Sequence, residues 1–114
     1  MRNAKQWLTM LFAMSALTLT TTNVTTLYTA PAAAQAIVKS ILVSNDSGSQ
    51  DTITLTITDS ASAVFSIYKL ESIGANSSEE LLKQPLIVME SEILKVTAAT
   101  AGRLHVVASY LEIT

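Results

Sequence analysis

Hydrophobic and polar positions alternate without a break in residues 51–59, the clearest pattern in the chain. Ile53, Leu55 and Ile57 fall on one side of an extended backbone, and the threonines between them fall on the other. This period of two is that of a β-strand, and β-branched threonine fits a solvated strand face because its χ1 angle is already restricted. The segment is therefore predicted to be a strand with one buried and one exposed face.

Similar stretches follow one another along the chain, separated by turn-forming residues. The further predicted extended segments are residues 17–29, 35–45, 64–70, 85–89, 92–98 and 104–113. Residues 79–83 fit either a short strand or a single helical turn. Strands separated by turns every eight to twelve residues or so are typical of antiparallel sandwiches and barrels. We predict an all-β fold, an antiparallel β-sandwich of the jelly-roll kind.

Strict alternation also predicts which side chains of residues 35–45 share a face of their strand. It places Ile37 and Ile41 together on one face. Val38 and Leu42 then point to the opposite face.

The N-terminal region allows two interpretations. Arg2 and Lys5 precede an apolar run at residues 7–17, which resembles the charged and apolar parts of a secretory signal cleaved after Ala16. Residues 5–17 also carry a partial helical period, but the apolar run is too short to span a bilayer. The interpretation that we prefer is an uncleaved arm or a first strand.

Length and composition restrict the classes of protein to which the chain can belong. At 114 residues one domain is expected, which we assign to residues 23–114, preceded by residues 1–22 as an arm or signal-like segment. Only 14% of residues are charged and the net charge is −2, so nothing in the charge balance attracts nucleic acid. The absence of cysteine excludes disulfides and thiolate metal sites. Serine and threonine make up about a quarter of the chain, and such a weakly charged surface suits a protein packed against neighbours.

Candidate chemical groups are few, and each has a simpler structural interpretation. His105 is the single histidine, and no partner stands at a spacing typical of a nucleophilic triad. Glu90 and Glu92 could suit acid–base chemistry or a cation, but a solvated turn between two apolar strands is the interpretation that we prefer. Residues 46–51 resemble a calcium loop only faintly, because the alternating acids and the final glutamate are missing. We therefore predict no catalytic, cofactor or metal site and no enzymatic activity.

Several segments together resemble the small β-sandwich virion proteins of tailed bacteriophages, especially those of marine and cyanobacterial phages. The matching segments are residues 25–31 (TTLYTAP), 36–41 (AIVKSI), 43–45 (VSN), 54–59 (TLTITD), 92–98 (EILKVTA) and the closing stretch to Ile113. The resemblance covers residues 23–114. It lies in the character of these segments and in their order along the chain, and it includes no catalytic motif. Residues 1–22 fall outside it.

The resemblance implies a structural subunit of the virion, such as a head decoration, neck, tail or fibre component. Proteins of this kind assemble as symmetric oligomers and dock on a capsid or tail lattice, so other virion proteins are the expected partners, with no nucleic acid or membrane. The predicted interface comprises Trp7, Leu11 and Phe12 in the arm, and Leu27, Tyr28 and Pro31 at a strand edge. Extended arms and edges of this kind bind by adding a strand to another chain.

A second class of function is compatible with the N-terminal pattern. An exported bacterial surface or adhesion module would lose residues 1–16 as a signal and bind a ligand on its loops. The turn-rich loops at residues 45–51 and 74–78 are the expected ligand-binding segments in that case.

Overall fold

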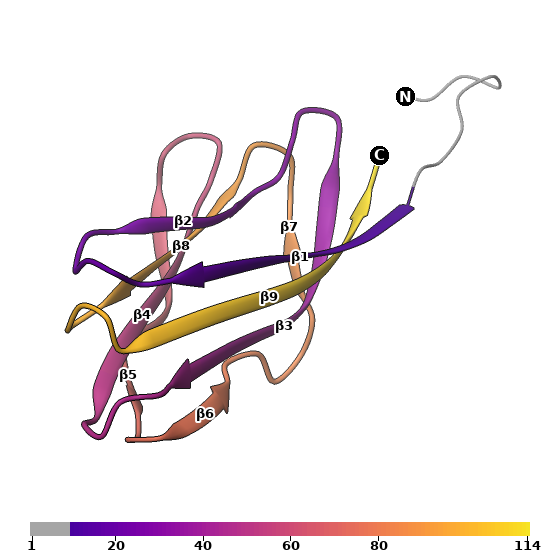
Figure 1. Ribbon diagram of the computed structural model, residues 1–114. Helices are drawn as coiled ribbons and strands as arrows, with labels where there is room; N and C mark the ends of the chain where they lie inside the picture. Colours follow the sequence, from indigo (N-terminus) through magenta and orange to yellow (C-terminus); the bar gives the residue numbers. More distant parts are fainter. Residues whose placement is uncertain (1–9) are drawn as a thin grey trace, which may run out of the picture.

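The chain forms a sandwich of two antiparallel β-sheets, seen in a computed structural model that describes residues 10–114 (Figure 1). In chain order the strands are β1 (Met10–Thr18), β2 (Thr25–Thr29), β3 (Gln35–Asn45), β4 (Asp51–Thr58), β5 (Val64–Ile73), β6 (Ser77–Glu80), β7 (Leu86–Val88), β8 (Ile93–Ala98) and β9 (Leu104–Ile113). No helix occurs between residues 10 and 114, and the prediction of an all-β fold is confirmed.

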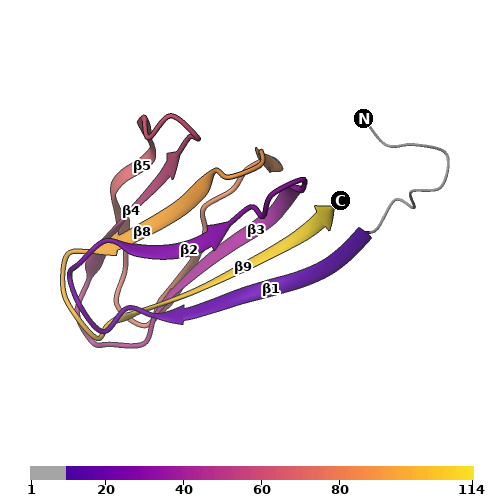
Figure 2. The ribbon, with the colours of Figure 1, turned by 90° about the horizontal axis from the view of Figure 1, so that it is seen from above.

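The order of the strands is that of a jelly roll. One sheet, called sheet A, has the order β1-β9-β3-β6, with β7 also paired to β3; the other, sheet B, has the order β2-β8-β4-β5. The strands β1 to β4 lie in turn in sheets A, B, A and B. After β5, which stays in sheet B, the strands β6, β8 and β9 lie in sheets A, B and A. Two packed sheets joined by such connections define a jelly roll, as predicted. Figure 2 shows the two layers from above, with β1 outermost beside β9.

Alternate side chains of the central strands fill the space between the sheets. Ile53 and Leu55 of β4 have no exposed surface, and the residues of β8 and β9 that face the core are equally buried. The β8 and β9 residues of this kind are Leu94, Val96, Leu104, Val106 and Ala108. Burying one Val, Leu or Ile side chain contributes about 1.5–3 kcal/mol, so this shared layer is the main source of stability.

A β-bulge in β3 changes which side chains reach the core. The register of β3 with β9 shifts between Val38 and Ser40, which leaves Lys39 as an extra residue. Because one inserted residue reverses the alternation, Val38 is buried together with Ile41, whereas Ile37 is only partly buried and belongs to the opposite face. The prediction that Ile37 and Ile41 share a face is therefore wrong.

Residues 10–18 form the first strand of sheet A. β1 pairs with β9 in an unbroken antiparallel register from Met10 opposite Ile113 to Thr18 opposite His105. The partial helical period of residues 5–17 therefore does not become a helix over the part described, and these residues correspond to the predicted first strand. Directly after β1, Leu19 is 1% exposed and belongs to the core.

We expect that a chain without residues 1–22 loses most of its stability, because it lacks β1 and the buried Leu19 side chain. A smaller change, Leu19→Ala in the full chain, should cost about 2–5 kcal/mol through lost burial and a residual cavity. Urea unfolding followed by circular dichroism measures both. A truncated chain that unfolds at the wild-type urea concentration would instead support residues 23–114 as an autonomous domain.

Candidate functional site

The edge strand β1 exposes three large apolar side chains on one face. Ala13, Ser15 and Leu17 face the sandwich interior and are partly buried. On the opposite face, exposed fractions are 57% for Met10, 74% for Phe12 and 67% for Met14. An antiparallel sheet usually presents a polar outer face to water, so this side of β1 departs from the common pattern.

The apolar character continues across sheet A. Paired residues of adjacent antiparallel strands share a face, and the registers place Phe12, Leu111, Ile37 and Ile87 in one row across β1, β9, β3 and β7. We call the following residues the outer face of sheet A: Met10, Phe12, Met14, Ile37, Leu42, Ile87, Val107, Leu111 and Ile113. The same registers also place Ser40, Ser109 and Glu80 on this face, with Glu80 opposite Leu42, so the continuous apolar part is the row through Phe12 and its neighbours in β1. A contiguous exposed apolar surface of this kind marks a site of interaction with another molecule.

Only part of the predicted interface lies on the surface of the chain. Leu11 is 55% exposed, Phe12 is 74% exposed, and Pro31 is exposed in the β2–β3 loop. Leu27 and Tyr28 are 3% and 7% exposed, so their side chains belong to the core of the chain itself. Trp7 lies outside the described residues. The interface role of these residues stays a prediction.

The other residues of the outer face were not predicted from the sequence, although apolar residues at outward-facing strand positions indicate them. Leu86, Ile87 and Val88 form an uninterrupted apolar run, and β9 likewise has Val107 between the buried residues Val106 and Ala108. In an antiparallel sandwich such runs require one apolar side chain to point outward. Applying this rule to each strand would have identified the outer face.

Tyr28 connects the two sheets near the β1 edge. Its hydroxyl donates a hydrogen bond to the Glu112 carboxylate at 2.6 Å, and its ring lies 4.3 Å from that of Tyr110. Burial, followed by the bond to Glu112, raises the pKa of the Tyr28 hydroxyl far above its ordinary value. Burial also raises the pKa of Tyr110. The edge strand β2 of sheet B is thereby fixed to β9 of sheet A through a protonated hydroxyl.

Glu80 protects the opposite edge of sheet A, where β6 ends. Its carboxylate accepts hydrogen bonds from the Ser40 hydroxyl, from the Ile41 N–H at 2.8 Å and from the Leu82 N–H at 3.1 Å. Burial acts to raise the pKa of Glu80, but these three bonds favour the ionised form and outweigh it, so that the pKa is lowered. At this edge the Glu80 carboxylate accepts a main-chain hydrogen bond from β3 that a neighbouring strand would otherwise accept.

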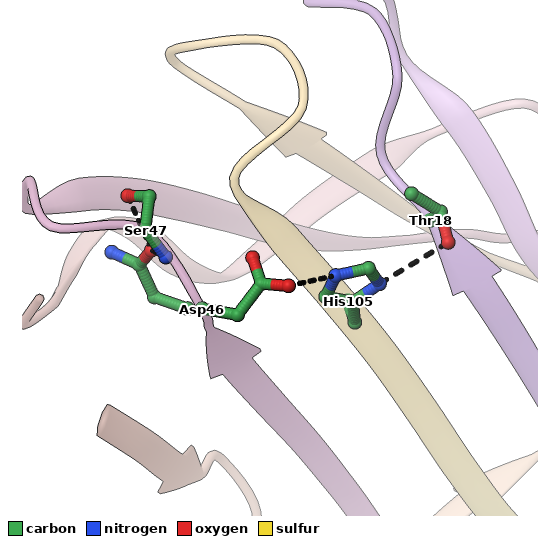
Figure 3. Close-up of polar contacts among 5 residues, drawn as sticks. Thr18, Asp46, Ser47 and His105 are labelled. Atoms are coloured by element: carbon green, nitrogen blue, oxygen red, sulfur yellow. Dashed lines mark hydrogen bonds and ion pairs between the residues drawn. The ribbon is translucent and has the colours of Figure 1, made fainter. Parts of the chain in front are cut away.

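His105 does have partners in space, although they are distant in sequence (Figure 3). Its Nε2 lies 3.2 Å from the Asp46 carboxylate, and its Nδ1 shares a 3.1 Å hydrogen bond with the Thr18 hydroxyl. The order carboxylate, imidazole, hydroxyl is that of a nucleophilic triad. However, the side chain of Asp46 is 68% exposed and that of His105 is 38% exposed, so water competes for each group. The cluster joins the ends of β1 and β9 to the β3–β4 loop.

A shallow open hollow of about 310 Å³ lies beside this cluster, between two loops. It is lined by Ser44, Asn45, Asp46, Asn76, Ser77 and Ser78. The loops belong to the segments 45–51 and 74–78 that the sequence marks as candidate ligand-binding loops. Its lining offers amide, hydroxyl and carboxylate groups, but Thr18 and His105 do not line it.

The remaining acidic candidates have structural roles. Glu90 accepts a hydrogen bond from the Ala33 N–H, and Glu92 accepts one from the Met89 N–H, so both carboxylates cap turns. Asp51 is 3% exposed and accepts hydrogen bonds from the Thr52 and Thr100 N–H groups. Within residues 10–114 no group of three or more histidine, aspartate or glutamate side chains is placed to hold a metal ion. The same residues contain no helix of the length and apolar character needed to cross a membrane.

Comparison with known proteins adds a fold relationship. No protein-family model and no curated protein matches the chain. Among solved structures, a chain of infectious bursal disease virus, Gx strain, superposes with a TM-score of 0.51 at 12% identity, covering 95% of this chain and 33% of the viral one. A chain of the Gt strain superposes at 0.45 with 8% identity, covering 96% and 33%, too distant to carry an argument. The chain thus spans about a third of the viral chain and shares the sandwich fold with that part.

Raising the pH should weaken the connection at Tyr28. Folding raises the pKa of the Tyr28 hydroxyl above its value in the unfolded chain, which is about 10 for tyrosine. The resulting contribution to stability is therefore fully present at pH values below about 10 and is lost at higher pH. We expect the free energy of unfolding to fall as the pH rises above about 10, and to fall less in Tyr28→Phe. At pH 7 the same substitution should cost about 2 kcal/mol, because it removes a hydrogen bond to a charged group. Urea unfolding from pH 7 to 11 measures both, and identical pH profiles for the two proteins would contradict this assignment.

Proposed function

We propose that the chain is a non-enzymatic structural subunit of a virion, and that it acts by binding other virion proteins. The observation that carries the proposal is the outer face of sheet A, where the apolar row of Phe12, Leu111, Ile37 and Ile87 crosses four strands. The jelly-roll sandwich shared with part of a chain from a virus structure supports it.

The finer proposal is a subunit of a tailed bacteriophage, located in the virion as a head decoration, neck, tail or fibre component. Its support is the sequence resemblance of residues 23–114 to small β-sandwich proteins of such phages. A homo-oligomer docked on a capsid or tail lattice is the assembly that this role implies. The low charged fraction agrees with it, since a surface that is covered by neighbours needs few charges to stay soluble.

Docking through the outer face gains free energy by burying side chains that water now surrounds. Ile87 and Leu42 are 49% and 41% exposed, and burying the exposed part of each contributes about 1 kcal/mol. The row across β1, β9, β3 and β7 offers this surface to a lattice partner. A lysine placed within it would remain charged and would oppose desolvation.

We expect Ile87→Lys to lower incorporation of the chain into particles by about tenfold or more, without loss of folding. Val24→Lys is the matched control, because Val24 is 64% exposed and lies in the β1–β2 loop, outside the outer face. The measurement is intact mass spectrometry of particles purified by density gradient from a source lysate. Wild-type chain missing from the particle band would refute the virion role, and equal incorporation of both variants would refute docking through this face.

The hollow between residues 45–46 and 76–78 favours a second candidate, an exported bacterial surface module that binds a ligand on these loops. This function predicts a shortened chain in the envelope or medium fraction and none in particles. In that case Ser78→Ala, at an exposed position that lines the hollow, should weaken ligand binding with little effect on stability. A full-length chain confined to the particle band would exclude this candidate.

A further inference from the structure

The four edges of the two sheets are protected to very different degrees. β2 is five residues long and has a bulge, and β5 shifts register twice against β4 and carries Lys69 and Glu71. β6 and β7 are four and three residues long, and β6 ends in Glu79 and Glu80. Short length, bulges and charges are the usual means by which proteins prevent edge strands from pairing with other chains.

β1 has none of these features. It is nine residues long, pairs with β9 without a register shift, and contains no charged residue, proline or glycine (MLFAMSALT). A long, regular and apolar edge strand is the kind that pairs with another strand. The contrast with the other edges indicates that β1 is kept available for pairing.

The hydrogen bonds of β1 show which of its main-chain groups are available. Leu19 N–H donates to the Leu104 carbonyl, in continuation of the register in which Thr18 lies opposite His105. Because hydrogen-bonded and non-hydrogen-bonded pairs alternate along an antiparallel ladder, odd-numbered residues of β1 bond to β9. The N–H and C=O groups of Met10, Phe12 and Met14 therefore point toward the open edge.

We propose that β1 pairs antiparallel with β1 of a second copy of this chain, about a two-fold axis at Phe12. This inference rests on the proposed assembly function and names the contact between subunits. The exposed apolar side chains are arranged symmetrically about Phe12, so this axis sets Met10 of each copy opposite Met14 of the other. Each pair joins two apolar side chains on the same face, which is the favourable arrangement across strands.

A second copy fits this edge better than an unrelated partner for three reasons. An antiparallel pair of identical strands is self-complementary, as a two-fold interface requires. The strand carries no charge, so two copies meet without electrostatic repulsion. The pairing also extends the row of Phe12, Leu111, Ile37 and Ile87 into its copy, and so doubles the width of the outer face available to a lattice partner.

The oligomeric state of the full-length chain tests the proposal. We expect sedimentation equilibrium to show a concentration-dependent dimer, and Phe12→Lys to weaken it by about tenfold or more, because two like charges would face each other at the axis. Phe65→Lys is the control: Phe65 is the other phenylalanine, is 55% exposed and lies on the edge strand β5. A wild-type chain that stays monomeric, or equal weakening by the two substitutions, would overturn the proposal.

Charge reversal tests the position of the axis and separates this contact from the virion role. Phe12→Lys and Phe12→Glu should each be monomeric, whereas their equimolar mixture should form a heterodimer, because opposite charges then meet at Phe12. A mixture that stays monomeric would refute an axis at this residue. A monomeric chain found in particles would overturn the contact alone, and a dimer that never enters particles would overturn only the virion role.

Discussion

The burial of alternate side chains between two sheets is the constraint on which the rest of this structure depends. The central strands β3, β4, β8 and β9 each give one face to this layer, and 14% charged residues leave few groups to cover the other. Residues paired across two strands share a face of the sheet. The side chains that face the core in one strand therefore determine which side chains face the core in the strands paired with it. The bulge at Lys39 shows this dependence, since one extra residue brings Val38 inside and leaves Ile37 outside.

Two kinds of surface stay exposed once this core is formed: the outer faces of the sheets and their edge strands. Tyr28 and Glu80 show how polar groups stabilise the edges of β2 and β6, through hydrogen bonds that connect the sheets or replace a strand. On the outer face of β1, by contrast, Met10, Phe12 and Met14 expose apolar side chains. Surfaces of this type suit the proposed contacts with a second copy and with a lattice partner, and each contact could form without the other.

The strands could be predicted because period-two patterns and turn residues are local properties of the sequence. The segments 35–45 and 104–113 coincide with β3 and β9, and residues 79–83 overlap the short strand β6. The bulge at Lys39 could not be predicted, because it depends on the register with β9, which is set by distant residues. For the same reason the contacts of His105 with Asp46 and Thr18, 59 and 87 residues away, were not foreseen. Leu27 and Tyr28 were assigned to an interface from their place beside Pro31. Both side chains are buried in the core, next to a bulge in β2 that depends on its register with β8.

Residue-resolved amide hydrogen exchange of the full chain, at low and high concentration, tests the central claim most directly: the open edge of β1 is an assembly surface. Ala13 and Ser15 should be protected at both concentrations, because they bond to β9. The amides of Phe12 and Met14 should exchange rapidly in dilute protein and become protected as the concentration rises. Rapid exchange at Phe12 and Met14 at every concentration would contradict the account.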